Sequence, residues 1–217
     1  MSLLILTNRH GAATCGSGPW YIYPRAIMEK GRVEAFSDGV LAVIITIMVL
    51  EMKAPAGANL EALRGSVPVL LAYALSYTNV GIFWNNHHHM LQVSKRVNGR
   101  VLWANLFLLF WLSLVPFVIH WMDDTHFAPL PTACYGVILA LAAIGYVMLQ
   151  QCLIGCNPNS PLAGAIGSDF KGKLSLTMYL VAIPMSFVHS WIAIALYIAV
   201  ALIWLAPDPR IEKTTGA

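Results

Sequence analysis

The sequence predicts an all-α fold: a polytopic membrane protein with six transmembrane helices. Hydrophobic residues make up 58% of the 217 residues and charged residues only 11%, whereas soluble domains carry about 25% charged residues. Apolar stretches long enough to cross a bilayer recur along the chain, and polar loop signals separate them. The net charge of +3 is small, and no basic stripe interleaved with aromatic residues occurs, so we expect no nucleic-acid partner.

Each predicted span is an apolar stretch close to the roughly 20 residues that a helix needs to cross a bilayer. The six spans cover residues 34–52, 66–90, 101–121, 131–154, 174–189 and 190–206. The first ends at a loop signal that contains Pro55 and Gly57. The second begins at Ser66, a candidate N-cap, with Pro68 in the first turn, where proline is tolerated.

Proline and length shape the later spans. We expect the third to bend near Pro116, and the loop 157–161 to follow the fourth. The last apolar run would be about 50 Å long as one helix, but the hydrocarbon core is only about 30 Å thick. We therefore divide it at His189, and we expect Pro184 to bend the fifth span.

The basic residues indicate the orientation. With six spans, every Lys and Arg except Lys53 and Arg64 falls on the side that holds both termini. Because basic residues concentrate on the cytoplasmic side, this distribution predicts an integral membrane protein with both termini in the cytoplasm.

The ends of the chain differ from the six-helix domain, residues 28–213. Residues 1–27 are rich in glycine and proline, and we expect a disordered extension or an over-extended gene start. Residues 214–217 are expected to form a disordered tail. Cys152 and Cys156 lie four residues apart without further ligands at suitable spacing, so reduced thiols are favoured over a metal site.

Ionisable and hydroxyl groups open the first span, in the octet Arg32–Gly39. Such groups are costly at the mouth of a membrane helix and therefore usually have a structural or functional role. At about 100° per residue, one face of the following helix carries Val43, Thr46, Ile47 and Leu50. This stripe could face lipid or neighbouring helices, and Thr46 could bond to the carbonyl of the preceding turn.

The second span ends in three histidines, His87–His89. Consecutive helical residues point about 100° apart, so they cannot all bind one ion. We favour a structural link in which His87 pairs with Asp38 or accepts a hydrogen bond from Arg32; pH sensing and metal binding are the alternatives.

Other polar groups give weaker signals. Asn105, Gln150 and Gln151 could join helices by hydrogen bonds. Four residues crowd the end of the third span: His120, Asp123, Asp124 and His126. We expect a solvated acidic loop there, with a metal site as the alternative. The chain has no zinc-protease, serine-hydrolase or Walker motif, so we expect no enzyme and no cofactor. The usual potassium-channel filter sequence is also missing.

A family resemblance adds to this interpretation. Arg32 followed by Phe36-Ser37-Asp38-Gly39, together with the helix that continues to Glu51, resembles the signature of the transmembrane protein 175 family of endolysosomal potassium channels. Trp84 and His87, the segment Leu106–Phe117 and the closing Pro207–Lys213 are also similar, so the resemblance covers roughly residues 28–213.

The resemblance implies a subunit without a re-entrant filter loop. Because the chain carries the signature once, it implies a homotetramer in which four copies of the first helix line the pore. Val43, Ile47 and Leu50 would form apolar constrictions, and Thr46 a hydroxyl ring for selectivity; the family commonly has isoleucine where this chain has Val43. A structural signature network is implied at Arg32, Phe36, Ser37, Asp38, Trp84 and His87.

The expected function is then a potassium-selective, voltage-independent leak-type cation channel in a prokaryotic plasma membrane. Voltage independence is expected because no span is rich in arginine. Two alternatives stay open: a proton-coupled secondary transporter that uses Asp38 and His87, and a membrane enzyme or metal-binding protein built on His87–His89.

Overall fold

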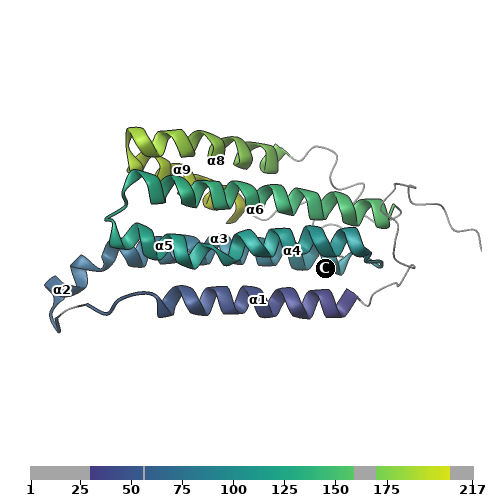
Figure 1. Ribbon diagram of the computed structural model, residues 1–217, viewed down its shortest axis with the longest axis horizontal. Helices are drawn as coiled ribbons and strands as arrows, with labels where there is room; N and C mark the ends of the chain where they lie inside the picture. The colour runs from purple at the N-terminus through teal and green to yellow at the C-terminus, as the bar shows by residue number, and fades with distance from the viewer. Residues whose placement is uncertain (1–29, 56, 159–169, 206–217) are drawn as a thin grey trace, which may run out of the picture.

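The protein is an elongated helical bundle. The computed structural model describes residues 30–55, 57–158 and 170–205, and every regular element within them is a helix, which confirms the all-α prediction there. Figure 1 shows the long helices side by side, with α1 along one edge and α8 along the opposite edge. The segments predicted as disordered, 1–27 and 214–217, lie outside the described residues.

Four helical segments have the length and composition of a membrane span. They are α1, α3, α4 together with α5, and α6, whereas α9 is apolar but shorter. The helices are α1 (Lys30–Leu50), α2 (Leu60–Gly65), α3 (Val67–Gln92), α4 (Gly99–Ser113), α5 (Val115–Asp124), α6 (Pro129–Cys156), α8 (Phe170–Val188) and α9 (Ser190–Leu205). The predicted fifth and sixth spans are thus present as α8 and α9, and their crossing of the bilayer stays a prediction.

Two boundaries differ from the sequence-based expectation. Helix α1 begins at Lys30, so the polar octet lies inside the helix and not before it. The predicted loop after α1 contains the short helix α2, whose N-cap Asn59 accepts a hydrogen bond from the Ala62 amide at 2.9 Å. Ser66 occupies the N-cap position of α3, but its side chain forms no capping bond there.

The third predicted span is interrupted, as expected near Pro116. Helix α4 ends at Ser113, Leu114 caps it, and α5 starts at Val115 with proline in its first turn. Proline has no amide hydrogen to give to the preceding turn, so the α-helical ladder breaks at this point. Pro184, in contrast, lies inside α8, which continues past it.

Helix α6 forms the centre of the core and packs against α4, α5, α8 and α9. Small residues let the helices approach closely. A Cβ added at Gly145 would lie 3.0 Å from the backbone of Leu108 in α4. The hydroxyl groups of Tyr135 and Ser76 share a buried hydrogen bond of 2.9 Å, which joins α6 to α3.

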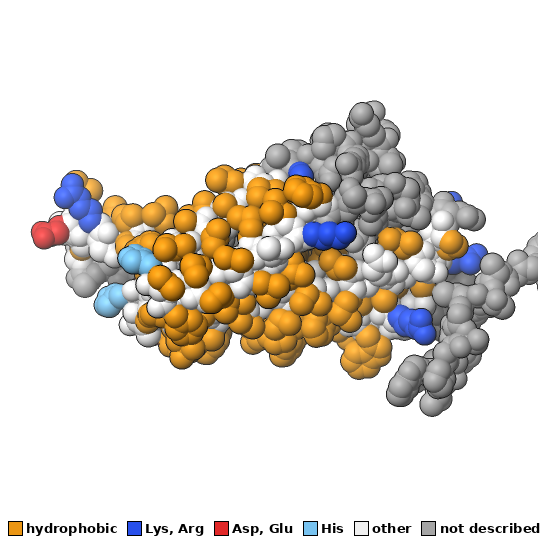
Figure 2. Space-filling model, turned by 90° about the horizontal axis from the view of Figure 1, so that it is seen from above, with side chains coloured by type: hydrophobic (Ala, Val, Ile, Leu, Met, Phe, Trp, Pro, Cys, Tyr) orange, Lys and Arg blue, Asp and Glu red, His pale blue; other side chains and the backbone are white. Residues whose placement is uncertain are grey.

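Apolar side chains cover the middle of the molecular surface. Figure 2, seen from the α8 side, shows this apolar area, with one basic group at the far left and the others spread from near the centre to the right-hand end. We call that end the basic end; it carries Lys30, Lys95, Arg96, Arg100, Lys171 and Lys173. An apolar middle between charged ends is typical of a membrane protein.

Candidate functional site

Helix α1 packs against the bundle with one stripe only. Val33, Ser37, Leu41, Ile44 and Met48 are buried, and they recur every three or four residues, so they lie on one face of the helix. That face meets α3, α4 and α5. The opposite face of α1, which carries Phe36, Val43 and Leu50, is exposed, and this agrees with the place of α1 at the edge of the bundle in Figure 1.

The unpacked face of α1 carries the predicted stripe. The side chains of Val43, Ile47 and Leu50 are 54%, 40% and 79% exposed. Thr46 lies on the same exposed face. Its hydroxyl donates to the carbonyl of Val43 at 2.9 Å, so the backbone bond that we considered for it is present. Because the proton is used in this bond, the oxygen lone pairs remain free to accept or to coordinate.

A shallow groove of about 730 Å³ runs between α1 and α5 beside this face. Phe36, Val43 and Ile47 line it on the α1 side, and Phe117 on the α5 side. Phe36 is therefore part of the exposed apolar surface. An apolar groove along a membrane helix is the kind of surface that lipid or another protein helix covers.

Behind the exposed face, three helices are joined by a buried chain of hydrogen bonds. Ser37 of α1 donates to the Val33 carbonyl at 2.8 Å and accepts from the Asn105 amide nitrogen at 2.9 Å. The Asn105 oxygen faces Nε2 of His87 at 2.7 Å. All three side chains are buried, with His87 only 1% exposed.

The order of these bonds defines the tautomer of His87. The hydroxyl proton of Ser37 goes to a carbonyl, so Asn105 must turn its amide nitrogen toward Ser37 and its oxygen toward His87. Nε2 of His87 is then the donor, and Nδ1 has no partner in the described part of the chain. Asn105 thus joins α1 to α3 through α4, as the sequence suggested for an interhelical hydrogen bond.

The expected pairing of His87 with Asp38 is wrong. Asp38 accepts a hydrogen bond from the indole nitrogen of Trp84 at 2.9 Å, and His87 turns to Asn105 because it lies one helical turn further on and faces α4. Arg32 is exposed and forms no hydrogen bond or ion pair with the described residues. The signature residues therefore form two separate links from α1 to its neighbours.

The three consecutive histidines do not converge. His88 lies 3.3 Å from Glu34 of α1 and stacks on the Trp84 ring, while His89 meets the edge of the His88 ring. Among the described residues no group of three or more His, Cys, Asp or Glu side chains is placed to hold a metal ion.

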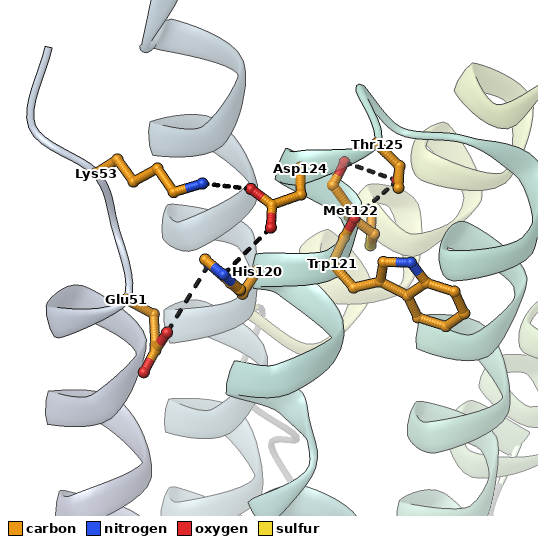
Figure 3. Close-up of polar contacts among 7 residues, drawn as sticks. All are labelled: Glu51, Lys53, His120, Trp121, Met122, Asp124 and Thr125. Atoms are coloured by element: carbon orange, nitrogen blue, oxygen red, sulfur yellow. Dashed lines mark hydrogen bonds and ion pairs between the residues drawn. The ribbon is translucent and has the colours of Figure 1, made fainter. Parts of the chain in front are cut away.

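A second polar cluster lies at the opposite end of α1 (Figure 3). Lys53 pairs with Asp124 at 2.5 Å, and His120 lies between Asp124 at 3.3 Å and Glu51 at 3.8 Å. The Asp124 carboxylate raises the pKa of Lys53, first because it accepts the ammonium hydrogen bond and then through its charge. The sequence placed His120 and Asp124 together, but their partners Glu51 and Lys53 were missed, although both directly follow the stripe.

The comparisons with known proteins agree with this arrangement. The family model described as endosomal/lysosomal potassium channel TMEM175 matches residues 32–116. A protein of Chryseobacterium sp. (strain P1-3), named a potassium channel, is 54% identical over 188 residues that cover 86% of this chain and 98% of that protein. Human TMEM175, named an endosomal/lysosomal proton channel, is 35% identical over 96 residues, 38% of this chain and 19% of that protein.

A solved structure shares the fold. The crystal structure of a lysosomal potassium-selective channel TMEM175 homolog from Chamaesiphon minutus superposes with a TM-score of 0.70 at 26% identity, over 81% of this chain and 96% of that one. The chain therefore belongs to the TMEM175 family of channels, and it is an integral membrane protein.

Proposed function

We propose that this protein is a potassium-selective, voltage-independent leak-type channel, formed by four copies of the chain around a pore lined by α1. The observation that carries the proposal is the unpacked apolar face of α1, with Val43, Ile47 and Leu50 on it. The bacterial relative that covers nearly the whole chain bears the name potassium channel, which supports potassium as the permeant ion.

A pore of this kind selects without a carbonyl filter. The carbonyl groups of an α-helix are used in its own hydrogen bonds, so they cannot replace the water around an ion. Apolar rings at Val43, Ile47 and Leu50 oblige an ion to lose part of its hydration shell, and dewetting of these rings closes the pore. Potassium holds its water less tightly than sodium and passes more easily. The free lone pairs of four Thr46 hydroxyls then offer partial compensation.

Two hydrogen-bonded links, one buried and one exposed, explain how the pore helix keeps its orientation. The Ser37–Asn105–His87 chain and the Asp38–Trp84 bond hold the back of α1 against α3 and α4. Ser37, Asp38, Trp84 and His87 are therefore assigned a structural role. For Arg32 and Phe36 a structural role is supported by the resemblance to the family signature and not by these links. Both termini lie in the cytoplasm of a prokaryotic cell in this proposal, because the basic end carries most of the positive charge. No cofactor takes part.

The direct test is the reversal potential of the purified protein in planar bilayers with potassium and sodium on opposite sides. We expect single-channel steps, a linear current–voltage relation and a reversal potential shifted toward the potassium equilibrium value. Smooth currents without channel steps would indicate a carrier and contradict the proposal. A proton gradient in the same bilayers measures proton permeation, since the vertebrate relatives are named proton channels.

The Thr46→Val substitution tests the hydroxyl ring. It keeps the shape of the side chain but removes the oxygen, so we expect a lower potassium-to-sodium permeability ratio with current retained. Thr177→Val is the matched control, because Thr177 is exposed on α8 and donates to its own helix in the same way. An unchanged ratio in Thr46→Val would remove Thr46 from the selectivity mechanism.

A further inference from the structure

A second cavity lies away from α1, between α3, α6, α8 and α9. Its volume is about 340 Å³, which is in the range of small-molecule sites. Aromatic side chains form much of its wall, including Phe83, Tyr146 and Trp204. No residue of α1, α4 or α5 lines it, so it is separate from the proposed pore.

Two polar side chains in the wall have no hydrogen-bond partner in the described part of the chain. The Gln150 side chain is only 8% exposed and Tyr179 only 3%, and both line the cavity. The neighbouring polar groups do have hydrogen-bond partners. Trp204 donates to Ser175 at 2.7 Å, and Ser175 donates to the Lys171 carbonyl at 2.8 Å. Neither polar group is among the side-chain atoms that are fully sealed from access, and both residues line the cavity. An amide and a hydroxyl without protein partners are costly within a membrane, so an occupant of the cavity that accepts hydrogen bonds would be stabilised.

The charge of the wall indicates what that occupant is. Gln150 and Tyr179 offer an amide N–H and an O–H, and Lys173 adds an exposed ammonium group at the rim. No Asp or Glu lines the cavity. Donors that line one cavity without a competing carboxylate favour an anion with several acceptor oxygens.

The position of the cavity indicates that the anion belongs to a lipid. Lys173 lies in the first turn of α8 at the basic end, where a membrane helix meets the headgroup layer. Val147 lines the cavity and is exposed, as is Leu180 on α8, so acyl chains can continue along the apolar outer surface. Basic pockets between membrane helices at this level bind anionic headgroups.

We propose that this cavity binds the phosphate-bearing headgroup of an anionic phospholipid, with Gln150, Tyr179 and Lys173 as its donors. A phosphate oxygen accepts from the Gln150 amide and the Tyr179 hydroxyl, and Lys173 neutralises the charge from the rim. The aromatic walls contact the glycerol and the first methylene groups. The bound lipid joins α3 to α8 and α9 and so stabilises the side of the subunit opposite the pore helix.

The test titrates the purified full-length protein in a neutral detergent with dioctanoyl-phosphatidylglycerol. Stabilisation is measured as the midpoint temperature of thermal unfolding. A ligand that binds only the folded state raises this midpoint as its concentration increases. Native mass spectrometry counts the bound lipid. We expect a saturable rise and a retained lipid with phosphatidylglycerol, but not with dioctanoyl-phosphatidylcholine, glycerol 3-phosphate or inorganic phosphate. An equal effect of glycerol 3-phosphate or inorganic phosphate would mean a free-anion site and overturn the lipid assignment.

Variants connect the effect to the cavity. Lys173→Met is expected to weaken phosphatidylglycerol binding about tenfold or more, the loss typical of one charge-assisted hydrogen bond. Tyr179→Phe and Gln150→Leu each remove one donor and should also weaken it. Lys95→Met is the matched control, because Lys95 is exposed at the same basic end but does not line the cavity. Equal binding by Lys173→Met, by Tyr179→Phe and by the unmodified chain would contradict the proposal, as would equal stabilisation by phosphatidylcholine.

Discussion

At the scale of single residues, Asn105 is the side chain on which the orientation of α1 depends most. It is the middle member of a buried chain that reaches Ser37 on one side and His87 on the other. Neither neighbour can turn to water, because both are buried. Removal of the amide therefore leaves a buried donor and a buried acceptor unpaired, which costs more than the loss of the hydrogen bonds themselves.

The Asn105→Leu variant tests this dependence. We expect its free energy of unfolding in detergent to fall by about 1–3 kcal/mol, the cost of unsatisfied buried groups. Asn85→Leu is the control, because Asn85 is exposed on α3. In the double variant with His87→Leu the loss should be smaller than the sum of the two single losses, since both act on one chain of bonds. Additive losses would show that the two residues act independently.

Ile47 differs from Asn105, because its proposed effect depends on contact with water in the pore and not on buried hydrogen bonds. It is exposed in the subunit, at 40%, and would form an apolar ring in the proposed pore. An amide at this position binds water and lowers the cost of wetting the ring. We expect Ile47→Asn to increase the leak current in bilayers, and Ile192→Asn, at an exposed site on α9, to leave the current per channel unchanged. A silent Ile47→Asn would place the constriction elsewhere.

At the scale of helices, periodicity predicts faces but not neighbours. The stripe of Val43, Ile47 and Leu50 follows from spacing alone, and the structure indeed leaves these side chains exposed. The partner of His87 could not be predicted in this way. Spacing gives the direction in which a side chain leaves its own helix, whereas its partner depends on which helix packs there and at what height.

Close contacts between helices fix the position of each helix along its neighbour, and Gly145 makes one of these contacts. A Cβ at Gly145 would lie 3.0 Å from the Leu108 backbone, tighter than ordinary contact. Leu108 is in α4, close to Asn105 in the sequence, so the α4–α6 contact also positions the buried chain of hydrogen bonds. Helix α2 was missed for another reason: it has only six residues, and its N-cap Asn59 lies in a segment whose sequence we interpreted as a loop.

The Gly145→Ala variant tests the close approach of α4 and α6. A methyl group against backbone cannot be accommodated by a rotamer change, so the helices must separate and lose packing. We expect the free energy of unfolding to fall by about 1–3 kcal/mol, despite the higher helix propensity of alanine. Gly155→Ala on the same helix, where an added Cβ meets open space, should not destabilise. An equal stability of both variants would contradict the packing argument.

At the scale of the whole molecule, the subunit has two different sides. Figure 1 shows α1 at one edge and α8 at the other. The α1 edge carries the apolar stripe and its groove, and the α8 side carries the cavity with unpaired donors. A single subunit does not enclose a conduit along α1, because that face is open. Permeation along α1 therefore requires further copies of the chain.

Cysteine cross-linking tests which edge meets those copies. Leu50 is 79% exposed on α1, and four copies around a pore would bring its side chains near one axis. In a chain whose native cysteines are replaced by serine, Leu50→Cys should give covalent dimers on mild oxidation or with a short bismaleimide, seen on a denaturing gel. Leu180→Cys, at a position that is 55% exposed on α8, should stay monomeric because its side faces lipid in the proposed assembly. Cross-linking of Leu180→Cys alone would show that subunits meet through α8, which would remove α1 from the pore.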